Sequence, residues 1–125
     1  MYELTINEKV YNFNFGVGFV REINKRVVKE VEGTNAKQDL GLQFAVAGLI
    51  DEDPIYLIDI LDIANKTERP RITRNELDAF VDDESTDISG ICKEVLDFLS
   101  RANASKKTTL AVIEMVEAEK AKANQ

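Results

Sequence analysis

The spacing of apolar residues changes once along this chain, close to residue 16, and this change limits the possible folds. Before it, apolar and polar residues alternate, as in a β-strand with one buried face. After it, apolar residues recur at spacings of three and four, as on one face of an α-helix. We therefore predict an α+β, mainly α fold, with an N-terminal β-hairpin followed by about five or six helices in one compact domain.

Two alternating segments predict the hairpin. Residues 2–6 and 10–15 each alternate apolar or aromatic side chains with polar ones, which is typical of strands. Residues 7–9 form the turn, where Asn tolerates a left-handed backbone. A two-stranded hairpin alone is only marginally stable in water, so its aromatic face must pack against the helices.

The helical part of the sequence has recognisable boundaries. Gly33 ends the first helix, whereas Asp53, Thr73 and Asp87 are side chains that cap the start of later ones. We predict helices over residues 19–32, 36–51, 54–65, 74–81 and 88–102, and one more after residue 107.

A polar stretch divides the chain near residue 103. We assign residues 1–103 to a globular domain of hairpin and helices, and residues 104–125 to a C-terminal polar linker and interaction helix. That helix has an apolar stripe too small to form a core of its own. Its members are our candidate partner-binding residues: Leu110, Val112, Ile113 and Val116.

Two positions are open for this C-terminal helix. It could lie in a groove of a neighbouring subunit or cover a client helix, which is a recurrent mode of recognition. Alternatively, it folds back on its own domain or frays, because short isolated helices are marginal in water. The edge of the hairpin is a second candidate surface, since an unpaired strand edge accepts another strand.

Charge and composition exclude several classes of partner. The net charge of -7 repels a phosphate backbone, so we expect no nucleic-acid partner. We recognise no leader sequence and no apolar run of membrane-spanning length, and therefore expect a cytosolic protein with no membrane partner. The single cysteine, Cys92, lies among apolar residues and fits a buried position in a reducing compartment.

The chain lacks the side chains that most catalytic and metal sites use. It contains no His, which excludes nucleophile–His pairs, and one Cys, which excludes the usual zinc sites. Gly16 and Gly18 open a helix, but the third Gly of a dinucleotide-binding turn is replaced by Arg21. We predict no catalytic, cofactor-binding or metal residues, no cofactor, and no enzymatic activity.

Two acidic clusters are the remaining candidates for chemistry, at residues 51–53 and 82–87. Counted from Asp83, the second resembles a calcium loop, but Ile88 occupies the sixth place, where that loop needs Gly. Acidic residues before helices are expected in any case, because they complement the helix dipole. An enzyme that depends on carboxylates stays the least favoured alternative.

Several short strings, taken in their order and spacing, resemble the tail assembly chaperones of long-tailed (siphovirus) phages and prophages of Gram-positive bacteria. The resemblance covers nearly the whole chain. Its one departure is Glu8, in place of a Gly in the hairpin turn. The strings lie at residues 2–7, 11–19, 21–24, 41–49, 53–54, 71–78 and 94–99.

This resemblance implies a function without catalysis. Such proteins bind the tape measure protein, a long helical chain, and keep it soluble while the tail tube protein polymerises around it. They act in the host bacterial cytoplasm, are absent from the mature virion, and tend to form homo-oligomers. The tail tube protein is a second candidate partner. The alternative is an acidic regulator or adaptor that binds a basic partner by charge mimicry.

Overall fold

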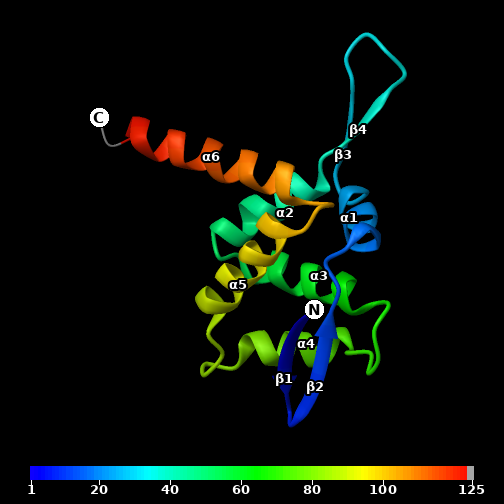
Figure 1. Ribbon diagram of the computed structural model, residues 1–125, viewed down its shortest axis with the longest axis vertical. Coiled ribbons are helices and arrows are strands. Elements are labelled where there is room, and N and C mark those ends of the chain that lie inside the picture. Colours follow the sequence, from blue (N-terminus) through cyan, green and yellow to red (C-terminus); the bar gives the residue numbers. More distant parts are fainter. Residues whose placement is uncertain (124–125) are drawn as a thin grey trace.

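The computed structural model describes residues 1–123, which form two hairpins and six helices (Figure 1). The predicted α+β, mainly α class with an N-terminal hairpin is confirmed. The strands are β1 (Tyr2–Ile6), β2 (Lys9–Phe13), β3 (Val28–Glu30) and β4 (Lys37–Asp39). The helices are α1 (Val17–Asn24), α2 (Gly41–Ile50), α3 (Pro54–Asn65), α4 (Arg74–Asp82), α5 (Ile88–Arg101) and α6 (Lys106–Ala123).

The first hairpin, β1–β2, packs its aromatic face against the helices. Tyr2 pairs with Phe13 across the antiparallel ladder, and both side chains are buried. The ring of Phe98 on α5 lies 5.4 Å from the ring of Tyr2, edge to face. Both turn residues, Asn7 and Glu8, have positive φ, as the tightest hairpin turns require. Glu8 therefore holds a backbone conformation that Gly would adopt more easily.

Asn65, at the end of α3, joins the first hairpin to the rest of the molecule. Its side chain is fully buried, and its amide nitrogen donates hydrogen bonds to the carbonyl oxygens of Asn12 and Pro70, at 3.0 and 3.2 Å. Its amide oxygen accepts hydrogen bonds from the backbone N–H of Ile72 at 2.7 Å and from Arg71 at 3.1 Å. One polar side chain thus bonds backbone groups of a strand and a loop, among them the buried N–H of Ile72.

Capping residues start the helices of the core where the sequence predicts them. The Asp53 carboxylate accepts a hydrogen bond from the N–H of Ile55, and Asp87 accepts one from Gly90. Thr73 and Glu76 form a reciprocal capping box. The predicted helices over residues 54–65, 74–81 and 88–102 agree with α3, α4 and α5 to within one residue at each end.

The prediction of two helices over residues 19–32 and 36–51 is wrong between Lys25 and Leu40. There the chain forms a second antiparallel hairpin, β3–β4, whose turn contains Gly33 in a left-handed conformation. α1 already ends at Asn24, whose side-chain oxygen accepts the N–H of Leu42 at the start of α2. This contact holds the end of α1 next to the start of α2. The segment between them must therefore start and finish at the same place, as the two strands of an antiparallel hairpin do.

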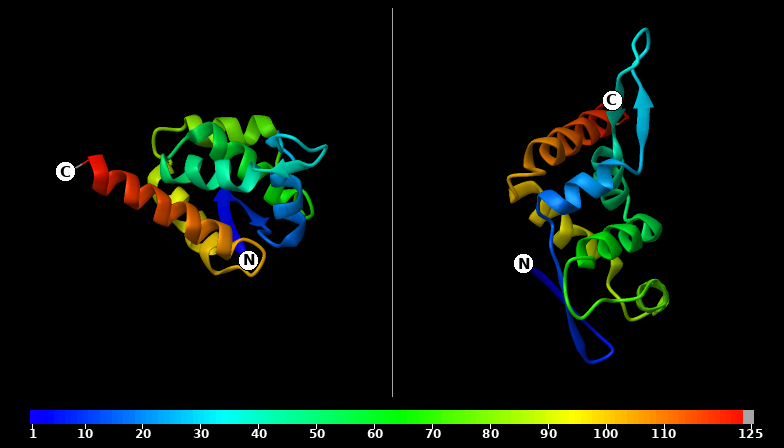
Figure 2. Two further views of the ribbon diagram at one scale, coloured as in Figure 1. Left: turned by 90° about the horizontal axis from the view of Figure 1, so that it is seen from above. Right: turned by 90° about the vertical axis from the view of Figure 1, so that its right-hand side faces the viewer.

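A close backbone approach explains why α2 begins where it does. Gly41 is buried, and a Cβ atom there would overlap the carbonyl group of Ile23 at the end of α1. Val27, Val28 and Val31 also fit helical spacing, but they are β-branched and favour strands, and Val28 begins β3. The β3–β4 arm, as we call residues 27–40, projects from the body at the opposite end from the turn of the first hairpin (Figures 1 and 2).

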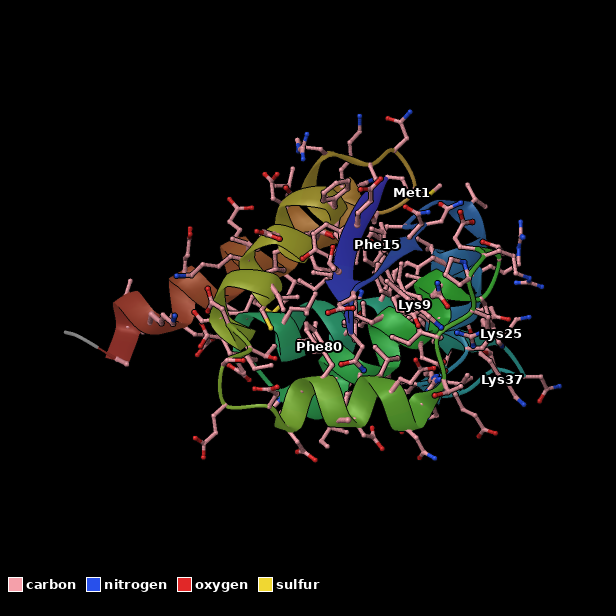
Figure 3. The ribbon with its side chains drawn as sticks, turned by 90° about the horizontal axis from the view of Figure 1, so that it is seen from below. Met1, Lys9, Phe15, Lys25, Lys37 and Phe80 are labelled. Carbon is pink, nitrogen blue, oxygen red and sulfur yellow. The ribbon has the colours of Figure 1, made fainter. Side chains whose placement is uncertain are left out.

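Side chains divide clearly between the body and this arm. Figure 3 shows Phe15 and Phe80 within the molecule, whereas Lys25 and Lys37 lie at its margin on the side that carries the arm. Every residue from Val28 to Asp39 is exposed. The arm therefore adds nothing to the buried core, which is formed by the first hairpin and the helices.

Candidate partner-binding groove

An apolar groove of about 430 Å³ runs between α2 and α6. Its walls are formed mainly by apolar side chains, with polar ones at one end, where α6 begins. The side chain of Phe44, on α2, is 46% exposed, and that of Met115, on α6, is 63% exposed. The lining residues are Gln43, Phe44, Ala47, Lys107, Thr108, Ala111, Val112, Met115 and Val116.

The structure divides the predicted C-terminal stripe between two sides of α6. Val112 is 8% exposed, and both it and Val116 line the groove. Ile113 is half-buried and Leu110 is 52% exposed, but neither lines the groove. Val112 and Val116, four residues apart, face α2, whereas Leu110 and Ile113, three residues apart, lie outside the groove lining, so the four residues do not form one surface.

Sequence reasoning missed the residues that open this groove to solvent. Neither Phe44 nor Met115 is among the candidate partner-binding residues that the sequence predicts. The available signal was the spacing of Ala111 and Met115, four residues apart on the same side of α6. An unbranched Met side chain is typical of binding surfaces that adapt to a partner.

The first half of α6 is held firmly against the body, and its second half leaves it. The Ser105 hydroxyl donates to the carbonyl oxygen of Leu99 at 2.7 Å, just before α6 begins. α6 packs against α2 and α5, and its Thr109 is fully buried, with a hydroxyl that has no hydrogen-bond partner within residues 1–123. Every described residue from Glu117 onward is exposed, and α6 extends away from the body there (Figure 1).

The second candidate surface is the edge of the first hairpin. Within the described residues β1 and β2 pair only with each other, so each strand has one edge without a strand neighbour. The inner side of the hairpin is closed: the backbone N–H of Asn14, just after β2, donates to the carbonyl oxygen of Ala64 at 2.8 Å. Val10, near the turn, is half-exposed.

The carboxylates of the calcium-like segment act in local structure. Asp83 accepts hydrogen bonds from the backbone N–H and the hydroxyl of Ser85, and these bonds hold the pKa of Asp83 below its ordinary value. Asp87 caps α5. Among residues 1–123, no group of three or more His, Cys, Asp and Glu side chains lies close enough to hold a metal ion.

Cys92 and Tyr2, both buried, belong to the core. Cys92 is fully buried, as predicted, and burial raises the pKa of its thiol to about 11. The Tyr2 hydroxyl donates to Glu94 at 2.6 Å, and burial together with this carboxylate raises the pKa of Tyr2. A more polar hollow between α1 and α3 contains Glu22 and Lys66, which pair with each other at 3.1 Å.

Comparison with known proteins finds one relationship. The family described as "Phage tail assembly chaperone protein, TAC" matches residues 3–114. The match covers both hairpins, α1 to α5 and the first half of α6, including Leu110, Val112 and Ile113 but not Val116. No curated protein and no solved structure matches the chain. Within residues 1–123, no helix combines the length and the apolar character needed to cross a membrane.

Proposed function

Since this chain belongs to the family of phage tail assembly chaperone proteins, we propose that it binds the tape measure protein and keeps it soluble during tail morphogenesis. Its role as a chaperone in tail assembly follows from the family. The identity of the client and the surface that binds it are our proposal.

The observation that supports the proposal best is the apolar groove between α2 and α6. Phe44 is 46% exposed and Met115 63% exposed in its walls, although both could be buried by a partner. A groove between two helices fits the apolar face of an amphipathic helix. The resemblance described above implies that the tape measure protein is a long helical chain, which carries many such faces.

The other parts of the proposal extend this role. We assign the body, residues 1–103, to the folded scaffold and residues 104–125 to partner binding, with Val112 and Val116 inside the groove. The tail tube protein is a second candidate partner, and the chain also binds copies of itself. It acts without catalysis in the cytoplasm of a Gram-positive host, encoded by a long-tailed phage or prophage, and leaves before the virion is mature.

Co-expression with the tape measure protein of the same genome tests the proposal. The wild-type chain should keep that protein in the soluble fraction and co-purify with it. Met115→Glu places a charge in the groove and should weaken binding at least about tenfold, because an apolar anchor becomes a charged group that binding must desolvate.

Ile55→Glu is the matched control. Ile55 is as exposed as Met115 but lies on α3, outside the groove, so the same change should leave binding within about twofold of wild type. Circular dichroism should show both variants folded. A tape measure protein that stays insoluble with the wild-type chain would contradict the function, and equal effects of the two variants would contradict the site.

A further inference from the structure

One side of α6 has opposite charges at its two ends. Lys107 lies in the first turn and Glu119 near the other end, with Ala111 and Met115 between them. The four residues are each four positions apart, so they follow one another along neighbouring turns of the helix. All four are exposed, and Lys107, Ala111 and Met115 line the groove.

Among residues 1–123, neither Lys107 nor Glu119 forms an ion pair. Glu119 lies in the segment of α6 from Glu117 onward, in which every described residue is exposed. Both side chains can therefore pair with opposite charges on another chain.

A second copy of this helix face, turned end to end, places each charge opposite a charge of the other sign. If a second copy of α6 lies antiparallel with its centre opposite Ile113, Lys107 faces Glu119 of the second copy, and Glu119 faces the second Lys107. In this register Ala111 lies opposite Met115, so a small side chain meets a large one twice. A parallel arrangement would instead bring like charges together, and it would also align the two helix dipoles unfavourably.

We propose that the partner which occupies this face is a second copy of the same chain, bound as a symmetric dimer with antiparallel α6 helices. Such an interface uses the same patch on both subunits, which is the usual form of a two-fold dimer. It also covers Phe44 and Ala47 on the α2 wall, next to Met115.

This dimer would close the groove that the proposed function assigns to the client. The competition between dimer and client, described next, rests on the proposed function. A second copy and a client helix then compete for one apolar surface. Self-association keeps the surface out of water until a client displaces the second copy, because only one of the two can be bound at a time.

Charge reversal tests the dimer without any client. Lys107→Glu and Glu119→Lys should each raise the dimer dissociation constant about tenfold, because both ion pairs of the dimer become repulsive. An equimolar mixture of the two variants should form a heterodimer as tight as wild type, since both pairs are then attractive again. The measurement is sedimentation equilibrium at low ionic strength, over a range of concentrations.

Lys106→Glu is the matched control, with the same charge change on the adjacent residue, which does not line the groove. It should leave the dissociation constant within about twofold of wild type. A wild-type chain that is monomeric at every concentration overturns the inference, as do single variants that dimerise like wild type or a mixture that stays monomeric. A dimer that behaves as described but binds no tape measure protein contradicts only the proposed function.

Discussion

The first hairpin, β1–β2, and the second, β3–β4, are both antiparallel and both have left-handed residues in their turns, yet only the first has a buried face. Tyr11 and Phe13 of the first are buried against the helices, whereas Val28 and its neighbours in the second are exposed. Pairing of backbone groups is common to both, so the difference lies in what the side chains contact.

The two hairpins also differ in how they are attached. The first is tied to α3, α4 and α5 through buried or half-buried hydrogen bonds of Asn65, Glu76 and Glu94. At the root of the second, Arg26 forms an exposed ion pair with Asp59 of α3, 3.3 Å apart, a type of contact that contributes little. We therefore expect the first hairpin to unfold with the whole molecule and the second to open by itself.

Phe13→Ala should have the largest effect on stability. Phe13 is fully buried in the aromatic cluster of the first hairpin, and its truncation leaves a cavity. The free energy of unfolding should fall by about 3–5 kcal/mol, measured by urea denaturation. A loss below about 1 kcal/mol would mean that the first hairpin is as independent of the core as the second.

Asn65→Ala should destabilise the chain by a smaller amount. The change removes the hydrogen bonds that Asn65 makes to Asn12, Pro70 and Ile72, and it leaves the N–H of Ile72 buried without this partner. A loss of about 2–3 kcal/mol is expected from such unpaired groups. Hydrogen exchange should show the amides of β2 exchanging faster in the variant, while those of β4 are unchanged.

Glu76 connects the first hairpin to α4 in a way that depends on pH. Hydrogen bonds from the backbone and hydroxyl of Thr73, and then from the hydroxyl of Tyr11, hold the pKa of Glu76 below its ordinary value of 4.5. A carboxylate with a depressed pKa stabilises the fold above its unfolded pKa, and that stability is lost as the pH falls through the folded pKa. Stability should therefore decline below pH 4.5.

Glu76→Gln should remove this part of the pH dependence. The urea midpoints of wild type and variant should differ at pH 7 and converge at a pH below the folded pKa, where the wild-type carboxyl is also neutral. A constant difference across this range would show that Glu76 acts through packing or capping alone. Glu3, an exposed carboxylate of β1, provides the control as Glu3→Gln, for which we expect no such convergence.

The same comparison shows how far the sequence determines the fold. The first hairpin is predictable because alternation of aromatic and polar residues fits only a strand with one buried face. The second was mistaken for helix because Val27, Val28 and Val31 fit helical spacing, and nothing local records that Asn24 caps α2 and that Gly41 meets Ile23. Those contacts are made between segments distant in sequence, which periodicity does not report.

The candidate groove was predictable only in part, for a similar reason. One of its walls, α6, has a visible apolar stripe, from which Val112 and Val116 were identified. The other wall exists only because α2 packs beside α6, and this packing leaves Phe44 half-exposed although its neighbours Ala45 and Val46 are buried. Exposure of one apolar residue within a buried helix is a property of the packing, not of the sequence pattern.

Val31→Ser should have the smallest effect, and it tests the independence of the second hairpin directly. Val31 is half-exposed beside the arm's turn and makes no contact with the buried core, so removal of its methyl groups should change the free energy of unfolding by no more than about 0.5 kcal/mol. The matched change in the first hairpin is Val10→Ser, at a similarly exposed valine beside the other turn.

If Val31→Ser costs more than 1 kcal/mol and the loss grows with protein concentration, the arm is buried in a contact between copies, because only association makes stability depend on concentration. If the loss is large but independent of concentration, the arm folds with the body, and the contrast between the two hairpins fails.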